Sequence, residues 1–228
     1  MLREQKKQGR RVAILHAAEV LIRETGSTEF SMRDLAARAG FSTATTYNLI
    51  GSKSTVLYAL LNQSLDRVGA ARSNLPIGPD PIEHVFQAAD AAVNYYTADA
   101  NFYRPLQRFL LSMSDPIQRP RYMQRAFVYW YDALAGFENT ATLKGKLVRE
   151  DLANQLMLSY AGVITLWVHD ELDSQQFRDQ IRTNVAFTLL ALSEPKHRER
   201  LLDLIGDART TAPILIQGGD LDDFTVTE

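Results

Sequence analysis

Apolar residues recur at every third or fourth position through most of this chain, and no segment alternates apolar and polar residues as a half-buried strand does. One such stripe runs from Val56 to Val68, and another runs from Ile82 to Tyr96. Prolines and glycines fall between the periodic segments, where they end helices rather than interrupt them. The pattern therefore predicts an all-α fold.

The periodic segments group into two units and a tail. A first unit over residues 1–53 is joined by a long helix, from Lys53 to about Arg72, to a second unit over residues 54–206. Residues 207–228 form a tail that receives no assignment. Prolines in Pro76–Pro81 predict a linker after the long helix, because proline cannot continue a helix. The other expected helices cover about residues 9–25, 31–39, 43–49, 82–96, 102–113, 121–137, 151–169, 174–192 and 195–205.

Two short helices near the N-terminus carry unusually clear start and stop signals. Ser31 and Asp34 have the spacing of a capping box, Gly40 follows the first helix where a positive φ is needed, and Ser42 can cap the second helix. Together they follow the pattern of a helix-turn-helix motif. A second helix of about seven residues is about 10 Å long and suits a DNA major groove about 12 Å wide. The alternative is a structural helical corner in an unrelated protein.

The second of these helices offers a surface suited to base edges. Its residues supply short hydroxyls, a methyl, a phenol and an amide, and no acidic residue interrupts them. Small residues at a helix N-terminus let the backbone approach DNA, and the positive end of the helix dipole faces phosphate. Lys53 is placed to meet phosphate as a point charge. The candidate contacts on this helix are Thr43, Ala44, Thr45, Thr46, Tyr47 and Asn48, after Ser42.

The stretch from Phe30 to Ser42, followed by Thr45-Thr46-Tyr47 and Ser52-Lys53, resembles the DNA-binding head of the tetracycline-repressor (TetR) family of bacterial regulators. The resemblance extends over residues 11–60. It implies an all-helical homodimer whose third helix reads DNA and whose C-terminal body binds a small-molecule inducer. By position, it also implies DNA contacts from Ser42, Thr43, Thr46, Tyr47 and Lys53, and from Arg33 on the second helix.

The charge is divided unevenly along the chain. Residues 1–60 hold nine Lys or Arg and five Asp or Glu, a net charge of +4, whereas the remainder holds 16 and 22, a net charge of −6. A basic head on an acidic body is typical of a DNA reader with a separate sensor, although a mixed solvated surface also produces such a division. Arg10, with Lys6, Lys7 and Arg11, either contacts DNA or belongs to a solvated, disordered start.

Aromatic residues concentrate in the second unit. Buried Tyr and Trp side chains each need a hydrogen-bond partner, so this density favours a mostly apolar cavity with a few polar groups, against the alternative of plain core packing. The expected ligand is apolar or aromatic. The candidate lining residues are Tyr103, Met113, Phe127, Trp130, Tyr131, Met157, Tyr160 and Ile164.

The last two strong helices have wide apolar arcs, and Ala161 and Gly162 would allow close helix approach. We interpret them as a two-fold, four-helix interface between protomers, the alternative being the core of a monomer. A dimer would place two recognition helices on half-sites roughly 34–36 Å apart. The candidate interface residues are Val163, Trp167, Phe177, Ile181, Val185, Thr188, Leu189 and Leu192.

Other classes of protein lack support in the sequence. The absence of cysteine excludes disulfide frameworks and thiolate metal sites, and the single Glu194-x-x-His197 pair is insufficient for a di-iron bundle. No phosphate loop or serine elbow is present, so we expect no catalytic residues, no metal and no cofactor. With no signal peptide and no apolar run long enough for a membrane span, we expect a cytoplasmic protein that does not contact a membrane.

We therefore predict a dimeric transcriptional repressor that binds a palindromic double-stranded DNA operator and responds to a small-molecule inducer. Two alternatives remain open. A ligand-independent architectural DNA-binding protein predicts a body cavity too small for a ligand. A helical enzyme predicts a polar cleft with converging titratable groups.

Overall fold

The computed structural model describes residues 2–75, 80–137, 148–190 and 195–209. Within these ranges the chain forms ten α-helices and one 3-10 turn and contains no strand, so the predicted all-α fold is confirmed. The helices are α1 (Leu2–Thr25), α2 (Met32–Ala39), α3 (Thr43–Ile50), α4 (Lys53–Ser73), α5 (Pro81–Thr97), α6 (Ala100–Ser112), α7 (Gln118–Ala133), α8 (Arg149–Val168), α9 (Ser174–Leu190) and α10 (Pro195–Arg209).

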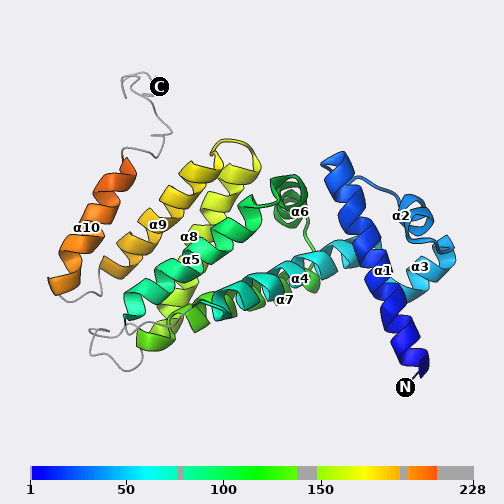
Figure 1. Cartoon of the computed structure of the whole chain (residues 1–228), viewed down its shortest axis with the longest axis horizontal. Coiled ribbons are helices and arrows are strands. Elements are labelled where there is room, and N and C mark those ends of the chain that lie inside the picture. Colours follow the sequence, from blue (N-terminus) through cyan, green and yellow to red (C-terminus); the bar gives the residue numbers. More distant parts are fainter. Residues whose placement is uncertain (1, 76–79, 138–147, 191–194, 210–228) are drawn as a thin grey trace, which may run out of the picture.

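Helices α1, α2 and α3 form a small head at one end of the molecule (Figure 1). Their apolar faces meet the first half of α4, where Val56, Leu57 and Leu60 are fully or almost fully buried. Ile14 and Leu35 supply the opposing side of this core, with no exposed surface. Helix α4 then continues without a break into the body, so one rigid element belongs to both parts.

The turn between α2 and α3 is built as the sequence predicts. The Ser31 hydroxyl accepts a hydrogen bond from the Asp34 amide at 3.1 Å, and the Asp34 carboxylate accepts one from the Ser31 amide at 3.0 Å. The Ser31 hydroxyl and amide hold the pKa of Asp34 below its usual range. Gly40 has φ +74° and ends α2, after which the Phe41 amide donates to the Ala36 carbonyl at 2.9 Å.

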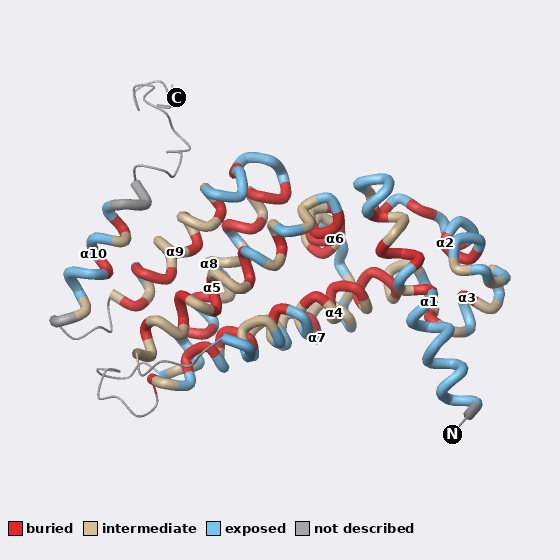
Figure 2. The backbone as a smooth tube through the Cα atoms, viewed as in Figure 1, coloured by how far each residue is buried: buried red, intermediate tan, exposed pale blue. Residues whose placement is uncertain are grey.

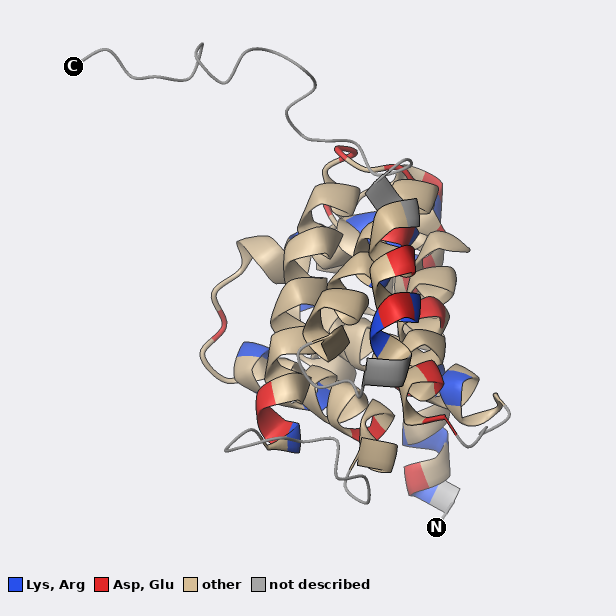
Figure 3. Ribbon diagram, turned by 90° about the vertical axis from the view of Figure 1, so that its left-hand side faces the viewer, with Lys and Arg blue, Asp and Glu red and all other residues tan. Residues whose placement is uncertain are grey.

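The body consists of α5 to α10 and the second half of α4. Helix α8 packs against α6, α7 and α9, and α9 also packs against α5 and α10. The largest fully buried side chains here are Phe86, Phe102, Phe137, Trp167 and Phe177. Figure 3 views the body from the end at which α10 lies and shows acidic and basic residues along α10. Among the described helices, none combines the length and the apolar character of a membrane-spanning segment.

The largest differences from the predicted helix boundaries are in α1, α7 and α10. Helix α1 begins at Leu2 rather than near Gly9, because its first turns contain residues that favour a helix but face solvent and so leave no apolar stripe in the sequence (Figure 2). The alternative of a disordered N-terminal start was therefore wrong. Helix α7 ends at Ala133, after which a 3-10 turn over Ala135–Phe137 brings Gly136 against Pro81.

Helix α10 continues to Arg209, beyond the predicted end near residue 205, and therefore enters the segment that received no assignment. Most of the predicted linker, at residues 76–79, lies outside the described residues, as do the tail from residue 210 and Glu194 of the candidate metal pair.

Replacing Gly40 with alanine tests the left-handed turn. A Cβ at Gly40 would meet no atom within 4 Å, so the cost comes from the positive φ alone. We expect Gly40→Ala to lower the free energy of unfolding by about 1 to 2 kcal/mol, measured by urea denaturation. The control is Gly69→Ala inside α4, also free of neighbours, which should raise stability by roughly 0.5 to 1 kcal/mol. The same sign for both variants would contradict the turn.

Candidate DNA-binding surface and body cavity

One face of α3 points away from the rest of the chain. Ala44, Tyr47 and Asn48 are exposed, as is the N-cap residue Ser42, and half of the Tyr47 surface is accessible at 50%. The Ser42 hydroxyl accepts from the Thr45 amide at 3.1 Å, which fixes the first turn of the helix. The first turn thus presents backbone N–H groups and small side chains toward solvent.

The three threonines of α3 differ in burial. Thr43 and Thr45 are half-buried, whereas Thr46 has no exposed surface and its hydroxyl donates to the Ser42 carbonyl at 3.1 Å. The prediction that Thr46 contacts DNA was therefore wrong. Thr46 lies on the inner side of α3, where α1 and α2 pack, and its hydroxyl is satisfied within its own helix.

Basic residues flank α3 on two sides. Arg33 is exposed on α2, and Lys53 begins α4, where it lies 3.4 Å from the Glu29 carboxylate and over the Phe30 ring. Arg10 is exposed on α1. With Arg3, Lys6, Lys7 and Glu4 it surrounds a depression that also includes Leu49 of α3. The first turns of α1 therefore place positive charge next to the end of α3.

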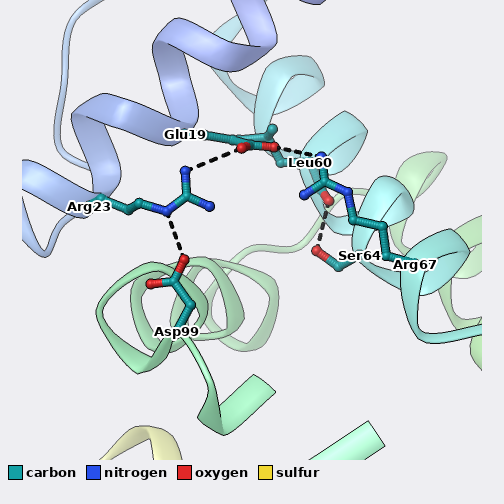
Figure 4. Close-up of polar contacts among 6 residues, drawn as sticks. All are labelled: Glu19, Arg23, Leu60, Ser64, Arg67 and Asp99. Atoms are coloured by element: carbon teal, nitrogen blue, oxygen red, sulfur yellow. Dashed lines mark hydrogen bonds and ion pairs between the residues drawn. The ribbon is translucent and has the colours of Figure 1, made fainter. Parts of the chain in front are cut away.

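A buried carboxylate joins the head to the body. Glu19 of α1, only 8% exposed, accepts hydrogen bonds from Arg23 on its own helix and from Arg67 on α4, both at 3.2 Å (Figure 4). Arg23 also donates to Asp99 at 2.7 Å, just before α6, and lies over the ring of Phe102. Two carboxylates and two guanidinium groups thus tie α1 to α4 and to the start of α6.

The same network reaches into a group of tyrosines in the body. Arg67 also hydrogen-bonds Tyr95. Burial lowers the pKa of Arg67, but the bond to Tyr95 and the charge of Glu19 raise it, and the net shift is upward. The ring of Tyr95 contacts that of Tyr103, with centroids 5.2 Å apart, and Tyr103 in turn contacts Tyr96 at 5.1 Å. Tyr96 lines a cavity in the body. The Glu19 network and the cavity are therefore connected by packed rings.

This cavity lies among α4, α5, α6, α7 and α8 and has a volume of about 90 Å³. Most of its wall is apolar. Two of the helices that line it, α4 and α6, also contact α1 of the head; α4 contributes Leu65 and Val68, and α6 contributes Leu110. The other lining residues are Ala92, Tyr96, Gln107, Leu111, Arg119, Tyr122, Met123, Ala126, Tyr129, Trp130, Met157, Tyr160, Ala161 and Ile164.

The cavity wall contains several hydroxyl groups. Tyr96 hydrogen-bonds Tyr122, which also bonds the buried Gln107 amide, and the Tyr129 hydroxyl donates to the Ala88 carbonyl at 2.6 Å. Burial raises the pKa of each of these three tyrosines, so they stay protonated. The hydroxyl of Tyr160 is buried as well but has no partner among the described residues.

Half of the predicted ligand-binding residues line this cavity, namely Trp130, Met157, Tyr160 and Ile164. The structure places the other four elsewhere. Tyr103 is buried against Tyr95, Tyr96 and Phe102, and Phe127 and Tyr131 are half-buried and stack on each other. Met113 is 43% exposed and borders a depression between α6 and the loop after α1. Their aromatic or flexible character alone did not identify which face they occupy.

Sequence reasoning missed five polar lining residues: Tyr96, Gln107, Arg119, Tyr122 and Tyr129. Gln107 is only 4% exposed and lies on α6 between the buried Leu106 and Leu110. Because Arg104 and Arg108 stand in the same segment, nothing in the sequence marked this amide as the polar group that faces inward. Leu65 and Val68 could not be identified as lining residues either, because they belong to the same apolar stripe of α4 that packs against the head.

Six of the predicted dimer-interface residues are buried within the protomer, so those predictions were wrong. Helices α8 and α9 pack against α5, α6, α7, α10 and one another, so their wide apolar arcs are covered within the protomer. Thr188 is half-buried and its hydroxyl donates to the Asn184 carbonyl, and Leu192 lies outside the described residues. The buried six are Val163, Trp167, Phe177, Ile181, Val185 and Leu189.

Removing the charge of Glu19 tests the junction. Glu19→Gln removes the carboxylate that Arg23 and Arg67 share, so Arg67 loses this ion pair and Arg23 keeps only its pair with Asp99. We expect urea unfolding to show a loss of about 1 to 3 kcal/mol, limited because both guanidinium groups keep part of their hydration. The matched control is Glu24→Gln, also on α1, whose ion pair with Arg38 is exposed; it should change stability by less than about 0.5 kcal/mol. Equal losses in the two variants would contradict the assignment.

The head matches a known protein family in sequence, and the chain resembles solved structures in fold. Residues 14–60 match the family described as bacterial regulatory proteins, tetR family. No curated protein sequence matches the chain. A TetR transcriptional regulator from Rhodococcus sp. RHA1 has a similar structure, with a TM-score of 0.67 and 19% identity over 83% of this chain and 100% of that chain.

Two further structures share the fold. SmeT, the repressor of the Stenotrophomonas maltophilia multidrug efflux pump SmeDEF, has a TM-score of 0.63 and 20% identity over 81% of this chain and 91% of its own. RolR, solved in complex with the ligand resorcinol, has a TM-score of 0.60 and 15% identity over 93% of this chain and 99% of its own. Residues 14–60 thus match the tetR family of bacterial regulatory proteins in sequence, and the chain shares its fold with these solved structures.

Proposed function

We propose that this chain is a transcriptional repressor that binds a palindromic operator as a homodimer and is released by a small, mainly apolar ligand in the body cavity. The observation that carries the DNA-binding part is the uncovered face of α3, where Ser42, Ala44, Tyr47 and Asn48 are exposed. Nothing in the described chain packs over this face, and a short helix of this kind fits a major groove.

Each group around α3 has a distinct expected role. The N-terminal turn of α3, including Thr43 and Thr45, brings backbone amides and methyl groups to base edges, and the Asn48 amide supplies a donor and an acceptor. Arg33, Lys53 and Arg10 carry positive charge that can meet phosphate, which fixes register without reading sequence. Because Arg10 is part of a helix, its position relative to α3 is set by the fold.

The outer faces of α8 and α9 are the best candidates for the contact between protomers. On α8 the exposed Leu158 and Gly162 are four positions apart, and on α9 Phe187 is 52% exposed. Residues 183–190 include no Lys, Arg, Asp or Glu. A glycine beside two large apolar side chains allows close helix approach, and the same patch on two protomers makes a two-fold contact.

Helix α4 gives the ligand a physical route to the head. Leu65 and Val68 line the cavity, and Leu57 and Leu60 of the same helix are buried under the head. A ligand that binds one position of α4 more tightly than another shifts the population toward that position. The ion pair of Arg67 with Glu19 would carry the shift to α1, changing the separation of the two heads.

The size of the cavity favours the ligand-independent alternative, since 90 Å³ is well below the roughly 300 to 1,000 Å³ of most ligand pockets. The unpaired Tyr160 hydroxyl and the flexible Met123 and Met157 in its wall favour a ligand instead. An enzyme would need converging titratable groups, whereas most titratable groups in this wall are tyrosines whose pKa burial raises.

Two substitutions separate base reading from phosphate contact. We expect Asn48→Ala to cost about 1 to 3 kcal/mol of binding free energy on the preferred sequence and little on other DNA, and Arg33→Ala to weaken both and to lower the salt slope by about 1. Fluorescence anisotropy would measure this on DNA selected by the protein from a random pool. Arg198→Ala, exposed on α10, is the control and should bind as the wild type does. Unchanged sequence preference in Asn48→Ala would contradict its role.

A charge on the α8–α9 face tests the dimer. Phe187→Asp and Leu158→Asp would each place a carboxylate in an apolar contact, and we expect the dimer dissociation constant to rise by at least about tenfold, measured by sedimentation velocity. Val128→Asp is the control, because Val128 is 47% exposed on α7 beside α4 and lies away from this face. A wild-type protein that sediments as a monomer, or dissociation only in the control, would rule out the interface.

A further inference from the structure

We propose that the cavity ligand is an uncharged single-ring molecule carrying one hydroxyl or carbonyl group, which hydrogen-bonds the hydroxyl of Tyr160. This inference rests on the proposed function only in that the cavity receives a ligand. It adds the chemical class of that ligand and the side chain that selects it.

The Tyr160 hydroxyl is the unsatisfied polar group in the described part of the cavity wall. Its oxygen is buried and has no hydrogen-bond partner, whereas the hydroxyls of Tyr96, Tyr122 and Tyr129 each bond another group. A buried hydroxyl without a partner is costly, and proteins rarely leave one in place without a reason. A ligand group at this point would satisfy it.

The Tyr160 ring is held so that its hydroxyl cannot easily turn to another partner. The ring contacts Trp130, with centroids 5.6 Å apart, and Phe177, with centroids 5.8 Å apart. Met157 and Ile164 lie three and four positions from Tyr160 on α8 and line the same cavity, as does the adjacent Ala161. The side of α8 that carries Tyr160 therefore faces the cavity as a whole.

The surroundings of Tyr160 disfavour an anionic ligand. Burial raises the pKa of Tyr160, and the neighbouring Tyr129 and Tyr122 raise it further. The same lack of solvation would penalise a carboxylate placed at this hydroxyl. Arg119 is the cationic group among the described lining residues, and its guanidinium donates to the Leu110 carbonyl. A neutral hydroxyl or carbonyl is therefore the group that fits.

The dimensions of the cavity limit the ligand to one ring. Its volume of 90 Å³ is smaller than the apolar cavity of about 150 Å³ that is known to hold benzene in another protein. Met123 and Met157 are unbranched and half-buried, so modest changes of rotamer can enlarge the space. A molecule of several fused rings would require helices to separate. The aromatic wall favours a flat ring over an aliphatic chain.

The test uses three probes of similar size and different polarity: phenol, toluene and benzoate. Each is titrated into the purified full chain at pH 7, where phenol is neutral and benzoate is charged, and the dissociation constant is measured by calorimetry. We expect phenol to bind about two- to tenfold more tightly than toluene, the difference corresponding to one hydrogen bond, and benzoate to bind most weakly.

Variants connect the result to Tyr160. Tyr160→Phe removes only the hydroxyl and should abolish the preference for phenol while leaving toluene binding unchanged. Tyr131→Phe is the matched control, since Tyr131 stacks on Phe127 outside the cavity lining, and should keep the preference. Ala161→Leu fills the cavity and should weaken every probe, with circular dichroism checking that the variant folds.

Three outcomes would overturn the inference: an unchanged preference in Tyr160→Phe, benzoate binding as tightly as phenol, or no saturable binding of any probe, which would mean that water alone meets the hydroxyl. These titrations contain no DNA. The proposed repressor function fails separately, if the chain does not bind selected DNA in the anisotropy assay.

Discussion

The buried stripe of α4 is the constraint on which both parts of the molecule depend. Leu57 and Leu60 close the core of the head, and Leu65 and Val68 close the cavity about two turns further along the same helix. Protein cores are close-packed, so a helix shared by two cores cannot shift in one without disturbing the other. Function at the head and events in the body are therefore mechanically linked.

Local chemistry made the turn between α2 and α3 predictable. Ser31, Gly40 and Ser42 act through hydrogen bonds or backbone angles within a few residues, so their roles follow from spacing alone. The orientation of Thr46 did not follow in this way, because tertiary packing decides which face of a short helix points inward. The helix-turn-helix motif and most of the exposed residues of α3 could therefore be predicted from the sequence, whereas the prediction for Thr46 was wrong.

The body was harder to predict because apolar character does not distinguish three destinations. A residue such as Phe177 on a wide apolar arc can face its own core, a partner or a cavity, and here it faces the core. The cavity was anticipated, but its lining depends on how five helices cross, which periodicity does not contain. Gln107 was missed for the same reason, since Arg108 beside it is polar too and the packing of α6 decides which of the two is buried.

The early start of α1 has a consequence for the energetics of binding. A disordered basic arm loses about 1 to 2 kcal/mol of backbone entropy for each residue that becomes ordered on a duplex. In this chain the residues from Arg3 to Arg10 are already helical, so that loss occurs during folding. Their positive charges can then contribute to association without a coupled disorder-to-order transition.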